Sequence, residues 1–83
     1  MDINLSTYSS KDLYICAFLQ TKGILPLRLE LRGKEYWFIF PNKNGKCDDL
    51  IENYWSEKEV VNVKKYSDAI KAVKQRIYSL YER

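Results

Sequence analysis

The chain has 83 residues, of which 46% are hydrophobic and 14% aromatic, and its formal net charge is +3. This composition indicates an ordered protein, and the length predicts a single domain over residues 1–83 with just enough chain for its own core. Histidine is absent, which excludes Ser-His and Cys-His catalysis and imidazole metal sites. Two cysteines are too few for a disulfide framework or a four-sulfur zinc site.

No membrane or export signal is recognisable in the sequence. A basic segment followed by a cleavable apolar one does not occur at its start, and no stretch approaches the ~20 apolar residues of a membrane span. We therefore expect a cytoplasmic protein without membrane contact. In that reducing compartment Cys16, which falls in an apolar helical run, is expected to be a small buried hydrophobe with no redox role.

The first predicted element is a helix over residues 10–22. Ser9 or Ser10 can cap its N-terminus, Asp12 suits the positive end of the helix dipole, and Gly23 is placed to end the helix. Apolar residues nearly surround the axis in the stretch LYICAFLQTK. Because such a helix must be covered on more than one side, we expect it to lie at the centre of the fold.

A β-hairpin is predicted next. Three leucines alternate with three charged residues in LRLELR, and the following Gly33-Lys34 pair fits a two-residue turn with glycine first. The register that this turn sets places leucines opposite aromatic side chains on an inner face. The inner pairs are Leu27 with Phe40, Leu29 with Phe38, and Leu31 with Tyr36.

The outer face of the same hairpin is polar apart from one large aromatic residue. Its pairs are Arg28 with Ile39, Glu30 with Trp37, and Arg32 with Glu35. A turn formed by Arg32 and Gly33 is the alternative. That turn would swap the two faces, because a slip of one residue moves every side chain to the other side of its strand.

A second helix is predicted over residues 47–56. Asp48 and Asp49 suit its N-terminal dipole. An apolar stripe directed at the core follows at helical spacing, formed by Leu50, Ile51, Tyr54 and Trp55. In the connector after this helix, Val60 and Val61 are candidates for a short third strand.

The last helix is predicted from the regular recurrence of apolar residues, with Asn62 as its N-cap. The stripe consists of Tyr66, Ala69, Ile70, Val73, Ile77, Leu80 and Tyr81. The order of elements is therefore helix, strand, strand, helix, helix. An isolated hairpin is only marginally stable in water, so the sequence predicts a small two-layer α+β domain with an antiparallel hairpin packed against helices.

Four stretches of the chain together resemble a small uncharacterised family of bacterial and phage-encoded α+β domains of unknown function. They are SSKDLYICAFLQTKGI, YWFIF, LIENYW and AIKAVKQRIY, and they occur in the family's order over most of the chain. Most of these residues are core aliphatics and aromatics. The resemblance therefore implies the fold and a bacterial or mobile-element origin, and it carries over no activity and no catalytic residue.

Charge alternates in blocks along the chain. Residues 27–46 hold five basic and two acidic residues, residues 47–60 one basic and five acidic, and residues 61–83 six basic and two acidic. This segregation favours a non-enzymatic binding module that contacts nucleic acid through the outer hairpin face and the last helix. The candidate contact residues are Arg28, Arg32, Lys34, Trp37, Lys71 and Lys74.

The physical basis of this hypothesis is that an aromatic ring flanked by guanidinium groups can stack on an unpaired base while the arginines hold phosphates. Two other interpretations stay open. Trp37 can simply cover the hairpin or be buried by a helix, and the lysines can be solvated flanks of their helix. As a function, the exposed hairpin also suits homodimerisation or docking to another protein.

An enzyme is not expected. Asp48 and Glu52 share a helix face and could hold Mg²⁺, but complementing the helix dipole explains acidic residues at this N-terminus. The stretch PNKNGK lacks the further glycines and the Gly-Lys-Ser/Thr ending of a phosphate loop. We therefore predict no catalytic residue, no metal site, no cofactor and no small-molecule substrate.

Overall fold

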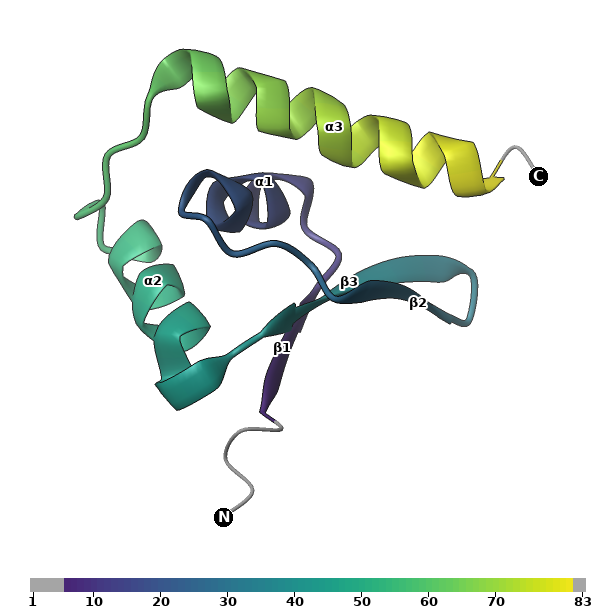
Figure 1. Ribbon diagram of the computed structural model, residues 1–83, viewed down its shortest axis with the longest axis horizontal. Coiled ribbons are helices and arrows are strands. Elements are labelled where there is room, and N and C mark those ends of the chain that lie inside the picture. The colour runs from purple at the N-terminus through teal and green to yellow at the C-terminus, as the bar shows by residue number, and fades with distance from the viewer. Residues whose placement is uncertain (1–5, 82–83) are drawn as a thin grey trace.

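The computed structural model describes residues 6–81, which form a three-stranded antiparallel sheet and three α-helices (Figure 1). In chain order the elements are β1 Thr7–Ser10, α1 Leu13–Thr21, β2 Arg28–Arg32, β3 Glu35–Pro41, the 3-10 helix η2 Lys43–Gly45, α2 Lys46–Trp55 and α3 Val63–Tyr81. The predicted α+β class is confirmed. The predicted order is corrected, because a strand precedes the first helix.

This additional strand, β1, makes β3 the central strand of the sheet. β1 pairs antiparallel with β3, with Thr7 opposite Pro41 and Ser10 opposite Phe38, and the strand order is β1-β3-β2. The predicted first helix therefore starts too early. Two serines expected to cap a helix are instead strand residues.

The hairpin has the register that the sequence predicts. β2 and β3 pair Arg28 with Ile39, Leu29 with Phe38, Glu30 with Trp37, Leu31 with Tyr36, and Arg32 with Glu35. Gly33 has φ of 64°, in the left-handed region that glycine enters without steric cost, which is the conformation a turn with glycine first requires. Leu27 lies just before β2, and its N–H donates to the carbonyl of Ile39 at 2.7 Å.

Helix α1 begins at its own aspartate cap. The Asp12 side chain accepts from the N–H groups of Tyr14 and Ile15 at 2.8 and 3.0 Å. Neither Ser9 nor Ser10 caps the helix, because both lie in β1. The prediction that α1 is central is confirmed, since it lies between the sheet and α3, with α2 beside it (Figure 1).

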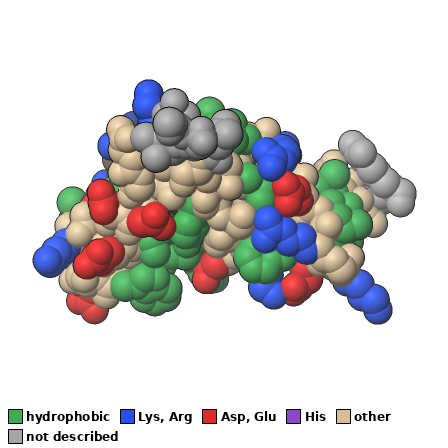
Figure 2. Space-filling model, turned by 90° about the horizontal axis from the view of Figure 1, so that it is seen from below, with side chains coloured by type: hydrophobic (Ala, Val, Ile, Leu, Met, Phe, Trp, Pro, Cys, Tyr) green, Lys and Arg blue, Asp and Glu red, His purple; other side chains and the backbone are tan. Residues whose placement is uncertain are grey.

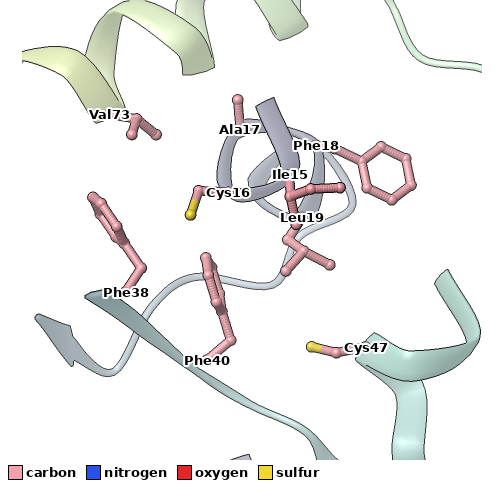
Figure 3. Close-up of a cluster of buried hydrophobic side chains, with 9 residues drawn as sticks. All are labelled: Ile15, Cys16, Ala17, Phe18, Leu19, Phe38, Phe40, Cys47 and Val73. Carbon is pink, nitrogen blue, oxygen red and sulfur yellow. The ribbon is translucent and has the colours of Figure 1, made fainter. Parts of the chain in front are cut away.

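The core forms where α1 meets the central strand (Figure 3). Phe38 and Phe40 point from β3 toward α1, and Val73 of α3 and Cys47 of α2 close the cluster from two further sides. From α1 come five consecutive buried residues, Ile15, Cys16, Ala17, Phe18 and Leu19. The interpretation of Cys16 as a buried hydrophobe is confirmed, and burial raises the pKa of its thiol to about 12.

Two details of the second half differ from the prediction. Trp55 does not face the core, because it ends α2 with 68% of its surface exposed and contacts Tyr54 edge to face at 5.1 Å between ring centroids. Val60 and Val61 belong to the connector before α3 and form no strand. The predicted cap of α3 is confirmed, since the Asn62 side-chain carbonyl accepts from the N–H of Lys65 at 2.9 Å.

Over the described residues 6–81, no helix combines the length and the apolar character that crossing a membrane would need.

Candidate functional site

The candidate site is the outer face of the sheet, which is the side turned away from α1. Because side chains alternate along each strand, residues of all three strands share this face. Its members are Ser9, Arg28, Glu30, Arg32, Glu35, Trp37 and Ile39. Seen from below the sheet, basic and acidic side chains intermingle over the hairpin, whereas acidic side chains are more frequent at the α2 end (Figure 2).

The middle of the outer face holds a carboxylate between two guanidinium groups. Glu30 accepts from Arg28 at 2.9 Å and from Arg32 at 3.1 Å, one arginine on each of its carboxylate oxygens. Arg32 also donates to the hydroxyl of Ser9 at 3.2 Å, which ties β2 to β1 across the central strand. These hydrogen bonds, from Arg28 first and then from Arg32, lower the pKa of Glu30.

Trp37 lies half-buried beside this arginine pair. The guanidinium carbon of Arg32 is 5.0 Å from the centroid of its ring, and the ammonium nitrogen of Lys11 is 5.6 Å from it. Both distances fall within the ~6 Å range of cation–π attraction. Lys11 is itself anchored by Glu35 at 2.7 Å. The indole is therefore flanked by two cations, each paired with a carboxylate of the same face.

The structure thus brings together three of the six predicted contact residues. Arg28, Arg32 and Trp37 are neighbours on the outer face, as the sequence indicates. Lys34 is exposed at the hairpin turn, where its carbonyl accepts from the hydroxyl of Tyr81 at 2.7 Å. Lys34 therefore lies at the turn end of the hairpin, and its side chain makes no hydrogen bond or ion pair among the described residues.

Lys71 and Lys74 lie elsewhere. Both are exposed on α3, which packs against α1 on the inner side of the sheet (Figure 1). The two lysines therefore belong to a different element from the residues of the outer face, although the end of α3 meets the hairpin where Tyr81 contacts Lys34 and Tyr36.

Two residues of the site escaped the sequence analysis. Lys11 and Ser9 reach the outer face only because β1 pairs with β3, whereas the sequence predicts a helix over residues 10–22 with Ser9 as a possible cap. The sequence of β1, TYSS, has no clear alternation of apolar and polar residues, because three of its four residues are small and polar. β1 is recognisable as a strand only from its pairing with β3, which the sequence alone does not show.

One outer-face residue is sealed from solvent. Ile39 is 1% exposed although it points away from the α1 core, so the accessible part of the face is the half nearer the hairpin turn. That half carries Trp37 and the charged pairs. Guanidinium groups there are already oriented by a carboxylate, and an anionic ligand with the same fork geometry, such as a phosphate, is a natural competitor for them.

The described residues contain no group of three or more His, Cys, Asp or Glu side chains that could hold a metal ion. At the start of α2, Asp48 instead accepts a hydrogen bond from the side-chain amide of Asn42 at 3.0 Å.

The comparisons with known proteins give a family and nothing finer. A family model described as "Domain of unknown function (DUF5659)" matches residues 5–79, which is nearly the whole chain. No match was found among the curated proteins or among the solved structures. The family match carries no ligand or activity to the site.

Proposed function

The chain belongs to this family of domains of unknown function, and we propose that it is a non-enzymatic binding module whose outer sheet face contacts single-stranded nucleic acid. The observation that carries the proposal is the pair of cations, Arg32 and Lys11, beside the indole of Trp37, with Arg28 held next to Arg32 by Glu30 on the same face of the sheet. An aromatic ring among cations offers a stacking surface for a base and donors for its phosphates.

Unpaired bases suit this face better than a duplex. Stacking on Trp37 requires a base that has left its neighbours, which a single strand offers and a duplex does not. Stacking on an aromatic side chain contributes about 1–3 kcal/mol per base and tolerates any sequence. The Glu30 carboxylate holds both arginines in the free protein, so binding is an exchange of that carboxylate for phosphate and is expected to be weak and salt-sensitive.

The experiment is fluorescence anisotropy with labelled single-stranded and double-stranded oligonucleotides at low and moderate salt. We expect Trp37→Ala to weaken single-strand binding about 5- to 160-fold, from the stacking energy above. Arg28→Ala should lower both the affinity and the steepness of the salt dependence, because one phosphate contact is lost.

The double variant Lys71→Ala/Lys74→Ala is the matched control, because it removes two positive charges from α3, which is not part of the outer sheet face. It should change affinity much less than Arg28→Ala/Arg32→Ala. Equal losses in the two double variants would show that the total charge, not the outer face, attracts the nucleic acid. A lack of salt-sensitive binding at roughly 10–100 µM, the range of weak non-specific association, would refute the proposal.

A second candidate function, docking to a protein or to a second copy of the chain, is favoured by a different observation. β2 is an edge strand, and two leucines, Leu27 just before it and Leu31 near its end, are both 57% exposed. An open edge with apolar side chains can pair with another strand. Light scattering over a wide concentration range tests the homodimer form. A dimer that Leu31→Lys dissociates supports it, and a strict monomer excludes it.

A further inference from the structure

A hollow lined by aromatic side chains lies apart from the outer sheet face, where α1, the end of α2 and the start of α3 meet. It has a volume of about 380 Å³ and is lined by Phe18, Tyr54, Glu57, Glu59, Val61 and Tyr66. That volume is within the ~300–1,000 Å³ typical of small-molecule sites. Three aromatic rings and two carboxylates therefore surround a cavity that the core does not fill.

The aromatic side of the cavity is well ordered by packing. Phe18 and Tyr54 lie with ring centroids 5.1 Å apart and tilted planes, and the hydroxyl of Tyr66 donates to the carbonyl of Tyr14 at 3.4 Å. Burial, more than any neighbouring charge, raises the pKa of Tyr66 to about 12. Tyr66 therefore remains a neutral ring near neutral pH. The face of such a ring is negative and attracts cations.

The chain itself already holds one ammonium group at the border of this site. The amine of Lys22 is 5.8 Å from the Phe18 centroid, 2.8 Å from a carboxylate oxygen of Glu59 and 3.0 Å from the carbonyl of Val60. Hydrogen bonding from Lys22 lowers the pKa of Glu59, which keeps this carboxylate ionised. The combination of ring face, carboxylate and carbonyl is thus one that stabilises an alkylammonium.

Glu57 adds a second carboxylate from a left-handed backbone position just after α2. It has φ of 61°, in the left-handed region where glycine is the usual residue after a helix, and its N–H donates to the carbonyl of Tyr54 at 3.1 Å. No ion pair involves Glu57 within the described part of the chain. A residue held in a disfavoured conformation points to a role for its side chain beyond ending the helix.

We propose that this cavity binds an alkylammonium group, free or N-methylated, with the rings of Tyr54 and Tyr66 around the cation and Glu57 as its counter-charge. A lysine side chain of a partner protein is one source of such a group, and a small quaternary ammonium ion is another. The site is independent of the outer sheet face, since neither Trp37 nor the arginines of β2 line it.

A neutral apolar ligand fits the observations less well. A purely apolar guest would leave Glu57 without a partner and would gain nothing from the ring faces beyond contact area. The charge of the ligand is therefore the decisive variable, and the tests compare cations with uncharged molecules of the same shape.

The first experiment is an NMR titration of the protein with choline, Nα-acetyl-lysine amide and its Nε-trimethyl form. The uncharged isostere of choline, 3,3-dimethylbutanol, serves as the control ligand. We expect shifts of the amides of residues 54–66 with all three cations, and binding at least about threefold weaker for the neutral alcohol. A preference for the lysine amides over choline would identify a side chain as the ligand, and the reverse would identify a small ion.

Variants then separate effects on cation binding from effects on the stability of the fold. Tyr66→Leu and Glu57→Gln should each weaken cation binding about 3- to 30-fold, whereas Glu52→Gln, in the last turns of α2 but outside the cavity lining, should not. Glu57→Gly is the sharpest variant. It should raise the urea midpoint of unfolding, because glycine accepts the left-handed backbone, and at the same time weaken cation binding.

A residue that only ends α2 would show the gain in stability without the loss of binding, which would overturn the proposal. Equal affinity for choline and 3,3-dimethylbutanol would overturn it as well. So would the absence of amide shifts around the cavity at about 50 mM ligand, because a single cation–π contact already supports binding in that range.

Discussion

The two strands of the hairpin have similar hydrophobic patterns but very different environments. On the inner face, β3 contributes Phe38 and Phe40, which are 1% and 0% exposed, whereas the inner leucine Leu31 of β2 remains 57% exposed. β3 lies at the centre of the sheet beneath α1, and β2 lies at its edge. The position of a strand in the sheet therefore helps to decide which of its apolar residues form the core. The alternation of apolar and polar residues in the sequence does not decide this alone.

The largest expected effect tests this contrast directly. Phe40→Ala should lower the free energy of unfolding by about 3–5 kcal/mol, because it leaves a cavity among α1, α2 and β3. Leu31→Ala should lower it by less than about 1 kcal/mol, because most of its side chain is already in water. Urea denaturation followed by circular dichroism measures both values.

Should Phe40→Ala prevent folding altogether, Phe40→Leu provides the measurable variant, with an expected loss of about 1–2 kcal/mol. Equal losses of unfolding free energy for Phe40→Ala and Leu31→Ala would contradict the contrast between β3 and β2. They would mean that the edge strand is as deeply packed as the central one.

A smaller effect is expected at the helix caps. Asp12→Ala and Asn62→Ala each remove a side-chain acceptor from a helix N-terminus and should cost about 1 kcal/mol. Asp12 caps the buried helix α1, and Asn62 caps α3, which covers it. Comparing the two variants therefore tests whether α1 and α3 unfold in one transition. Asp12→Asn, which keeps the acceptor, is the control and should behave nearly as the unchanged protein.

Unequal midpoints by circular dichroism and by tryptophan fluorescence in Asn62→Ala would indicate that α3 opens separately from the rest of the described fold.

The smallest effect concerns the outer face, where the charges are in solvent. Because the arginines lower the pKa of Glu30, any stability from this group is present above the ordinary glutamate pKa and is lost as the pH falls through the lowered value. An NMR pH titration should place its midpoint below that of a free glutamate. Arg28→Ala should move the midpoint upward, and a midpoint unaffected by this variant would contradict the observed ion pair.

Much of the hairpin could be predicted from its sequence, for reasons that are local. Gly33 fixes the turn, the turn fixes the register, and the register places Glu30 opposite Trp37. The arginines Arg28 and Arg32 follow by alternation. Nothing beyond neighbouring residues is needed for these steps, and each is confirmed.

The parts that could not be predicted depend on contacts between distant segments. β1 is short and mostly polar, and only its pairing with the distant strand β3, which joins Thr7 to Pro41 and Ser10 to Phe38, makes it a strand. Trp55 continues a helical stripe, yet it lies at the end of α2 beyond the reach of the core. The cavity beside Glu57 is likewise formed by three helices and a connector, so no single stretch of sequence contains it.

The position of α3 has a consequence for how the chain is synthesised. Among the described elements this helix leaves the ribosome last, and its Val73 is one of the residues that cover α1 (Figure 3). The nascent chain therefore emerges with the α3-facing side of α1 around Ala17 still uncovered. During that interval the growing polypeptide presents an apolar surface to chaperones, and translation to the end of α3 is what removes it.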